Sequence, residues 1–210
     1  MKALLENPLA ALRAVLPQTP PPDAGCDEFA AYPDIHPGQA EPVAAAVLIP
    51  VIARPEPTLL FTQRTPHLSR HSGQISFPGG RRELGDLSPV ETALRETQEE
   101  TGIAPSLVSI AGFLPRYITG TGFDIAPVVG VVAPDFMAVP DPREVAEIFE
   151  VKLSFFLDPA NAQLIHRELA GRPRSVHVFE PDGRTIWGIT AALLFDFAGR
   201  LKAGHAIGTP

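Results

Sequence analysis

Three glutamates, Glu96, Glu99 and Glu100, occur at i, i+3 and i+4 within a short segment of the chain. In an α-helix this spacing places all three carboxylates on one side, within an arc of about 100°. Like charges at such spacings repel each other by roughly 0.2–0.5 kcal/mol per pair. Carboxylate oxygens are the ligands that hard divalent cations prefer. The spacing therefore predicts either a solvated acidic surface or a binding site for divalent metal ions.

The helix that carries these glutamates has clear signals at both ends. Ser88, Pro89 and Glu91 form a capping box with proline at the first helical position, and Gly102 supplies the C-terminal stop. The side away from the acids carries residues suited to a core: Val90, Ala93, Leu94, Thr97 and Thr101. We expect a short helix with one core face and one acidic face.

The composition limits the classes of partner. A chain of 210 residues with 45% hydrophobic residues is typical of a globular domain with a sizeable core. The net charge of −7 argues against a general nucleic-acid binder, which needs Lys and Arg to neutralise phosphates. The single Cys26 cannot form an internal disulfide, and Glu6 and Pro8 interrupt any signal-peptide run. We expect a cytoplasmic protein with a small-molecule substrate and no membrane partner; a homodimer stays open.

Two regions are expected along the chain. Residues 1–42 are predicted to form an N-terminal helix followed by a Pro-rich arm, and residues 43–210 the main domain. The helix is predicted from the apolar residues Leu4, Leu5, Leu9, Leu12, Val15 and Leu16. Its face is expected to pack on the protein, with a partner-binding role as the alternative.

The main domain alternates between extended and helical patterns. The predicted strands are Ala44–Ile52, Thr58–Gln63, Leu107–Leu114, Phe123–Val132, Ile148–Leu153 and Ser175–Phe179. A last apolar helix is predicted at about Trp187–Leu201. Strands, helix, strands and helix in this order indicate an α/β fold with a mixed sheet between helices.

The acidic helix and the glycines before it resemble the box of the Nudix hydrolases. The matching residues are Gly80, Arg95, Glu96, Glu99, Glu100, Gly102 and Ile103. Two departures are visible: Thr97 replaces an aliphatic residue, and the spacer from Gly80 to Arg95 is one residue longer than usual. As a result Leu87 stands at the position of an early glutamate when counted from Arg95, and Asp86 is the neighbouring acid. The resemblance implies an α/β/α sandwich and metal-dependent hydrolysis of a diphosphate.

The segment before the box is similar to the signature of the coenzyme A diphosphatase branch of that family. The matching elements are Leu59-Leu60, Thr62, Arg64, Gly73 and Phe77-Pro78-Gly79-Gly80. Ser69 stands where the branch has arginine, and Arg70 is adjacent. The resemblance implies that the substrate is bound by Arg64, Arg70, Gly73, Phe77 and Gly79.

The same resemblance implies the catalytic groups. Mg²⁺ or Mn²⁺ would be held by the three glutamates and the backbone carbonyl of Gly80, with Glu99 also counted as catalytic. Arg95 would orient a carboxylate through a bidentate hydrogen bond, the alternative being an ordinary surface ion pair. A general base would come from Glu144 or Glu147, which are equally well explained as solvated acids of a loop and a helix start.

The predicted reaction is hydrolysis of coenzyme A or its thioesters to 3′,5′-ADP and 4′-phosphopantetheine or its acyl form. The alternatives are hydrolysis of another nucleoside diphosphate derivative such as ADP-ribose, and a non-catalytic Nudix-like binding module. Arg81 and Arg82 add positive charge beside the glycines. Tyr117 and Phe123 are either core residues, which is favoured, or stacking partners for adenine.

Overall fold

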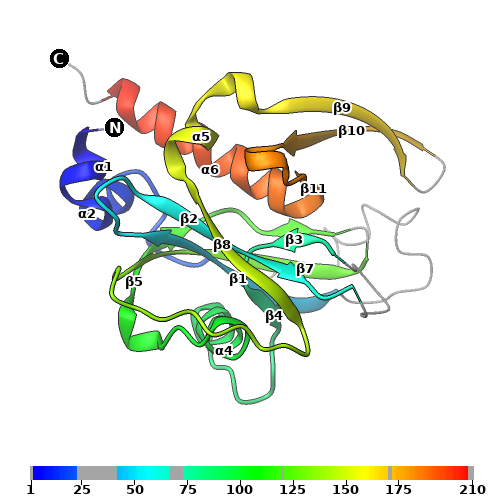
Figure 1. Cartoon of the computed structure of the whole chain (residues 1–210), viewed down its shortest axis with the longest axis horizontal. Coiled ribbons are helices and arrows are strands. Elements are labelled where there is room, and N and C mark those ends of the chain that lie inside the picture. The colour runs from blue at the N-terminus through cyan, green and yellow to red at the C-terminus, as the bar shows by residue number, and fades with distance from the viewer. Residues whose placement is uncertain (1, 23–41, 67–72, 120, 170–171, 208–210) are drawn as a thin grey trace.

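The computed structural model describes residues 2–22, 42–66, 73–119, 121–169 and 172–207. Its centre is an eight-stranded mixed sheet in which β1 and β7 are parallel along their whole length (Figure 1). The main path runs β3-β2-β1-β7-β5, while β4, β6 and β8 pair with β1, β7 and β2. The strands are β1 Val43–Ile52, β2 Thr58–Arg64, β3 Ile75–Ser76, β4 Gly79–Arg81, β5 Val108–Phe113, β6 Tyr117–Ile118, β7 Phe123–Val132 and β8 Val145–Lys152.

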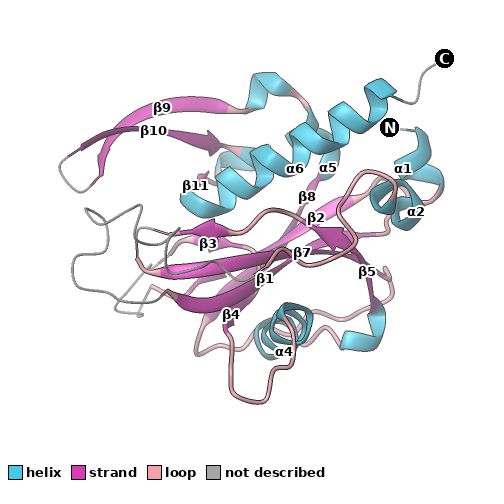
Figure 2. Ribbon diagram, turned by 180° about the vertical axis from the view of Figure 1, so that it is seen from behind, coloured by secondary structure: helices cyan, strands magenta, loops and turns pink. Residues whose placement is uncertain are grey.

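Helices cover both faces of this sheet, as the sandwich prediction requires. Helix α4 (Pro89–Thr101) lies on one face, and α6 (Gly188–Ile207) crosses the other (Figures 1 and 2). Alternation along the strands explains the two contacts, since successive side chains point to opposite faces. Leu48 and Val128 pack in the cluster that contains Ala93 of α4, whereas Ile49 and Val129 join the core cluster of α6. The predicted mixed sheet between helices is therefore confirmed.

A second, three-stranded sheet lies beside α6. It consists of β9 (Gln163–Leu169), β10 (Arg172–Phe179) and β11 (Ile186–Trp187) in the order β11-β10-β9. The predicted run Ser175–Phe179 falls within β10, but the sequence pattern did not indicate β9. A short helix α5 (Leu153–Leu157) connects β8 to this region, with 3₁₀ turns at Pro105–Leu107, Pro159–Asn161 and Pro181–Gly183.

The N-terminal segment forms two helices instead of the single one predicted. They are α1 (Lys2–Glu6) and α2 (Pro8–Arg13), and the break lies at Asn7. Proline is suited to a first helical turn and disrupts a helix interior, and the Asn7 side chain accepts a hydrogen bond from the Ala10 amide at 3.0 Å. The expected packing face is present, because Leu4, Leu12 and Leu16 belong to the main core cluster. Most of the Pro-rich arm lies outside the described residues.

Candidate active site

Two glycines bring the backbone of β4 against the acidic helix. Gly79 and Gly80 pair with Val47 and Ala46 of β1. A Cβ atom at Gly79 would lie 2.4 Å from the Ala46 carbonyl oxygen, and one at Gly80 would lie 2.4 Å from Cδ of Glu96. Such separations do not occur in real proteins, so the β1 backbone excludes a side chain at Gly79, whereas a side chain at Gly80 would displace the Glu96 carboxylate. The close approach places the Gly80 backbone directly beside a carboxylate.

The three glutamates of α4 differ in their surroundings. Glu100 is buried, and the Gly79 amide donates a hydrogen bond to its Oε2 at 3.3 Å. Burial and the charge of Glu96 raise the pKa of Glu100 to about 8. Burial also raises the pKa of Glu96, although Arg95 opposes this effect. Glu99 is exposed. The site thus holds two crowded, desolvated carboxylates and a third at its edge.

Arg95 connects these carboxylates to a buried acid that sequence reasoning left without a role. Its Nε and Nη2 donate to Oδ1 and Oδ2 of Asp86 at 3.2 and 3.0 Å, so the bidentate partner is Asp86. Its Nη1 donates to Glu96 at 2.9 Å and to Glu99 at 3.2 Å. Arg95 therefore orients two of the three glutamates and is itself held by an aspartate.

The position of Asp86 explains how the site accommodates a spacer that is one residue longer between Gly80 and Arg95. Its carboxylate accepts hydrogen bonds from the Glu83 amide at 2.9 Å and the Thr92 hydroxyl at 3.0 Å. The Arg95 guanidinium, with these bonds, lowers the pKa of Asp86 to about 2 despite burial. Leu87, which stands in the register counted from Arg95, is 81% exposed. The sequence did carry a signal for this role, because Asp86 is the acid next to Leu87. The extra residue in the spacer shifts Asp86 to the position at which it contacts Arg95.

The donor set fits hard divalent cations, although it is not arranged as a finished coordination shell. Among the described residues, no three acidic or histidine side chains already converge on one ion position. Instead the Arg95 Nη1 atom holds Glu96 and Glu99. Mutual repulsion and burial disfavour the charged forms of Glu96 and Glu100, and a bound cation would offset both effects. Oxygen donors of this kind suit Mg²⁺ or Mn²⁺.

One candidate base precedes the edge strand β8 and the other lies within it. Glu144 immediately precedes β8, and its charge contributes to the raised pKa values of Glu96 and Glu100, which places it near both. Glu147 lies within β8 opposite Gln63, and its carboxylate forms an ion pair with Arg184 at 2.7 Å. The expectation of a helix start at these acids was wrong, because Glu144 lies in a turn and Glu147 pairs with Gln63 of β2 as part of a strand.

The predicted substrate residues have separate locations. Arg64 ends β2, where its charge opposes the rise in the pKa of Glu100 that burial causes. Its buried Nε has no hydrogen-bond partner among the described residues. Phe77 is 3% exposed and stacks on Phe61 with ring centroids 5.0 Å apart, so it packs in the core. Gly73 has a positive φ of 68°, which glycine adopts without strain. Arg70 lies outside the described residues.

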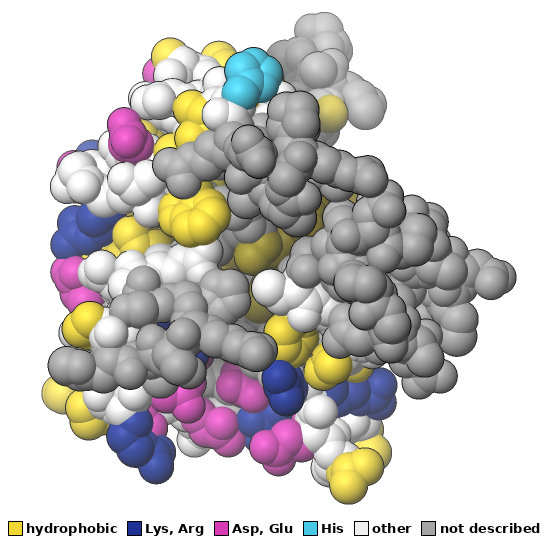
Figure 3. All heavy atoms as spheres, turned by 90° about the vertical axis from the view of Figure 1, so that its right-hand side faces the viewer, with side chains coloured by type: hydrophobic (Ala, Val, Ile, Leu, Met, Phe, Trp, Pro, Cys, Tyr) yellow, Lys and Arg dark blue, Asp and Glu magenta, His cyan; other side chains and the backbone are white. Residues whose placement is uncertain are grey.

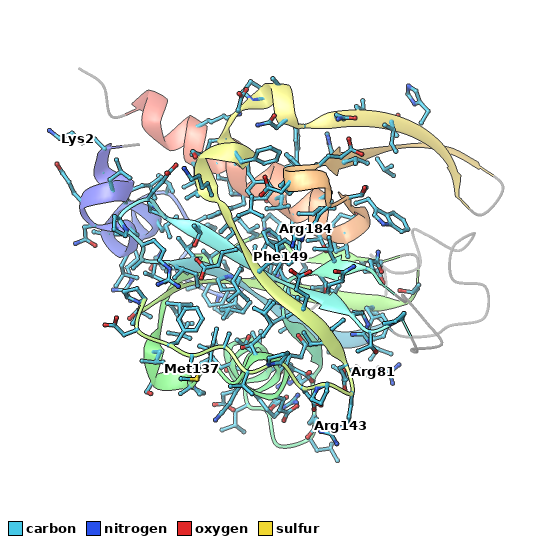
Figure 4. The ribbon with its side chains drawn as sticks, viewed as in Figure 1. Lys2, Arg81, Met137, Arg143, Phe149 and Arg184 are labelled. Carbon is cyan, nitrogen blue, oxygen red and sulfur yellow. The ribbon has the colours of Figure 1, made fainter. Side chains whose placement is uncertain are left out.

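The outer surface reflects this arrangement. Figure 3 shows acidic and basic side chains gathered next to each other on the lower part of the face it presents. Figure 4 shows that Arg81 and Arg143 lie at the end of the molecule where β8 begins. The site combines carboxylates that can bind cations, the Arg64 guanidinium that can bind a phosphate, and Glu144 near the carboxylates. These are the groups that metal-assisted hydrolysis of a phosphate ester or anhydride requires.

Comparisons with known proteins agree with this geometry. A family model described as NUDIX domain matches residues 42–175. An "Uncharacterized Nudix hydrolase NudL" of Yersinia enterocolitica is 40% identical over 150 residues, which cover 71% of this chain and 77% of the relative. One of the same description from Pectobacterium atrosepticum is 40% identical over 154 residues, 73% of this chain and 80% of the relative.

The fold has counterparts among solved structures. The chain resembles the crystal structure of a MutT protein from Methanosarcina mazei with a TM-score of 0.52 and 19% identity. The likeness covers 80% of this chain and 99% of that one. Within the described residues, none of the helices combines the length and apolar character needed to cross a bilayer.

Proposed function

The chain belongs to the Nudix family and is a hydrolase of pyrophosphate bonds, and on that premise we propose that it cleaves the diphosphate of coenzyme A or its thioesters. The products would be 3′,5′-ADP and 4′-phosphopantetheine or its acyl derivative. The observation that carries the proposal is the position of Arg64. This residue of the coenzyme A branch signature lies close enough to Glu100 for its charge to oppose the rise in the pKa of that carboxyl group, and its buried Nε has no hydrogen-bond partner among the described residues.

The divalent cations would be Mg²⁺ or Mn²⁺, and they would be held by Glu96, Glu99, Glu100 and the Gly80 carbonyl. When bound, such ions neutralise diphosphate charge and lower the pKa of water. Arg95 holds Glu96 and Glu99 in orientation, and its own position depends on Asp86. This arrangement would orient the ligands for the metal ions.

The remaining groups act on the substrate and on the attacking water. The Arg64 Nε atom has no hydrogen-bond partner within the described part of the chain, and it would donate to a phosphate oxygen of the substrate. Glu144 is the better placed base, since its charge acts on both Glu96 and Glu100, whereas Glu147 is paired with Arg184. Glu144 would accept the proton of the attacking water.

The test is product analysis by mass spectrometry after incubation with coenzyme A and Mg²⁺ or Mn²⁺, beside a panel that includes ADP-ribose. Glu100→Gln is expected to reduce turnover by orders of magnitude, because it removes a charged ligand without changing the side-chain volume. Glu91→Gln is the matched control on the same helix, since glutamine also serves in a capping box. In the same assay, Glu144→Gln should reduce turnover more than Glu147→Gln.

Two results would contradict the proposal. Equal or better activity on ADP-ribose would contradict the coenzyme A assignment, but the protein would still be a hydrolase of pyrophosphate bonds. Unchanged turnover in Glu100→Gln would remove the assignment of the metal ligands. In the wild type, metal ions should also raise the melting temperature, since a ligand that binds only the folded state stabilises it.

A further inference from the structure

Three residues near the glycines of β4 project from one face of the sheet, although they come from different strands. Tyr117 of β6 pairs with Ile125 of β7, and Ala45 of β1 pairs with both Ile125 and Arg81 of β4. Phe123 is two residues before Ile125. Because paired residues share a face and residues i and i+2 do as well, the side chains of Tyr117, Phe123 and Arg81 lie on a common face.

Within this group, a guanidinium lies over an aromatic ring. The Arg81 Cζ is 5.2 Å from the centroid of the Phe123 ring, a cation–π contact. Strands β4 and β7 flank β1, so their backbones are about 10 Å apart. The Arg81 side chain therefore reaches across β1, where Ala45 is too small to obstruct it. We call Arg81, Phe123 and Tyr117 the stacking platform.

The backbone under the platform is held at both ends. The Arg81 carbonyl accepts a hydrogen bond from Arg95 Nη2 at 2.9 Å. At the other end, the Phe123 amide donates to the Thr119 hydroxyl at 3.0 Å, and the Thr119 amide donates to the Phe123 carbonyl at 2.8 Å. The backbone of Arg81 is therefore connected through the Arg95 guanidinium to the Glu96 carboxylate.

The platform is exposed, and its guanidinium has no acidic partner within the described part of the chain. Arg81 is exposed, Tyr117 is 42% exposed, and Phe123 is only half-buried. Among the described residues, no acid forms an ion pair with the Arg81 guanidinium, and Figure 4 shows Arg81 at the end of the main sheet. Core packing of Tyr117, the favoured expectation from sequence, is wrong because nearly half of the side chain is exposed.

These observations indicate a ligand with a flat π-system. Bases stack on aromatic side chains and on the planes of arginine guanidinium groups. Arg81 follows Gly80 directly but projects to the opposite face from Glu96, since successive residues of a strand alternate. The nucleoside of a diphosphate held at the glutamates would therefore have to pass around β4 to reach the platform.

We propose that the stacking platform binds the nucleobase of the substrate by stacking it on the Arg81 guanidinium. The inference rests on the proposed function, which it deepens by identifying the residues that recognise the nucleoside half. It applies equally to coenzyme A and to other adenine nucleotides, because both present the same base.

The experiment compares Arg81→Ala, Arg81→Lys and Phe123→Leu with the wild type on two substrates. One is the nucleoside diphosphate that the wild type hydrolyses, and the other is its abasic analogue, with the base replaced by hydrogen. For the nucleoside substrate, we expect each variant to raise KM about five- to a hundredfold with kcat retained. For the abasic analogue, KM should stay at the wild-type value. Arg200→Ala, at a remote ion pair with Asp196, is the control and should change neither.

Arg81→Lys separates stacking from charge, since lysine keeps the charge but lacks the planar face. Full activity of Arg81→Lys would overturn the proposal in favour of a phosphate contact. The proposal is also overturned if KM is unchanged in Arg81→Ala and Phe123→Leu, or if the abasic analogue is affected as strongly as the nucleoside. Melting temperatures of all variants identify any loss of folding, and Arg81→Ala, at an exposed position, is expected to fold.

Failure of the proposed function has a different result. If the wild type hydrolyses ADP-ribose but not coenzyme A, the substrate proposal fails, and the platform is tested on ADP-ribose. If it hydrolyses neither, the platform is tested by measuring the equilibrium affinity for adenosine 3′,5′-bisphosphate and for its abasic counterpart. Preferential binding of the nucleotide that Arg81→Ala removes supports the platform, and equal or absent binding overturns it.

Discussion

Replacing Asp86 with asparagine tests the network that holds the acidic helix. The substitution preserves size but removes the charge that two nitrogen atoms of Arg95 contact at 3.2 and 3.0 Å. The guanidinium, only partly exposed, then retains Glu96 and Glu99 as its acidic partners at hydrogen-bond distance. We expect a loss of stability and, because Arg95 orients these glutamates, a loss of turnover.

The size of the stability effect follows from the pKa of Asp86. Folding lowers it from 3.8 to about 2, and the carboxylate is 9% exposed, so solvent screens the interaction little. A shift of this size corresponds to about 2 kcal/mol of folding free energy at pH 7. Because folding lowers the pKa, the stabilisation is complete once the pH is about one unit above the unfolded-state value of 3.8. It is lost as the pH falls through the folded-state value of about 2. The difference between wild type and variant should therefore be about half as large at pH 3.

The assay is urea unfolding of both proteins at pH 7 and pH 3, followed by circular dichroism, with turnover measured at pH 7. Asp141→Asn is the control, because the pKa of Asp141 is also lowered to about 2 but its partner Arg143 is exposed. Its effect on stability should be distinctly smaller. The reasoning is refuted if Asp86→Asn changes neither the unfolding midpoint nor turnover at pH 7, or if its effect equals that of Asp141→Asn.

Two further predictions concern the glycine contact and the N-terminal helices. Gly80→Ala places a Cβ 2.4 Å from the Glu96 Cδ, so Glu96 must move; we expect weaker Mn²⁺ binding by calorimetry together with lost turnover, and wild-type affinity would contradict the close approach. Leu12→Ala removes a side chain that is 0% exposed, and we expect it to lower the unfolding free energy by about 2–5 kcal/mol in a urea titration. Leu5→Ala, at a 46% exposed position, should be nearly neutral, and equal losses in the two variants would show that α2 does not contribute to the core.

Local chemistry made the acidic helix predictable. The Ser88 side chain accepts a hydrogen bond from the Glu91 amide at 3.2 Å, and Gly102 ends the helix in the left-handed conformation with φ 73°. Both interactions join residues within one turn of each other, and the spacing of the glutamates depends only on the helical repeat. The long apolar strands β1 and β7 were predicted for a similar reason, since their composition alone favours a buried strand.

The short strands and the second sheet required the folded chain. Strand β4 is a three-residue segment with two glycines. Strand β9 contains mostly polar residues and is held in an extended conformation by antiparallel pairing with β10. Such segments have little intrinsic preference, so the pairing partner decides their conformation. The same holds for Glu147, whose segment reads as loop or helix until β2 pairs with it.

The sequence by itself determined the helix with its three carboxylates, the glycines before it and the mixed character of the sheet. Only the tertiary structure decided that Asp86 holds Arg95, that Glu144 lies near the glutamates and that Arg81 covers Phe123. The physical reason is the range of the interactions. Helical spacing and capping act within a few residues, whereas side chains from separate strands meet only after the sheet has formed and fixed their common face.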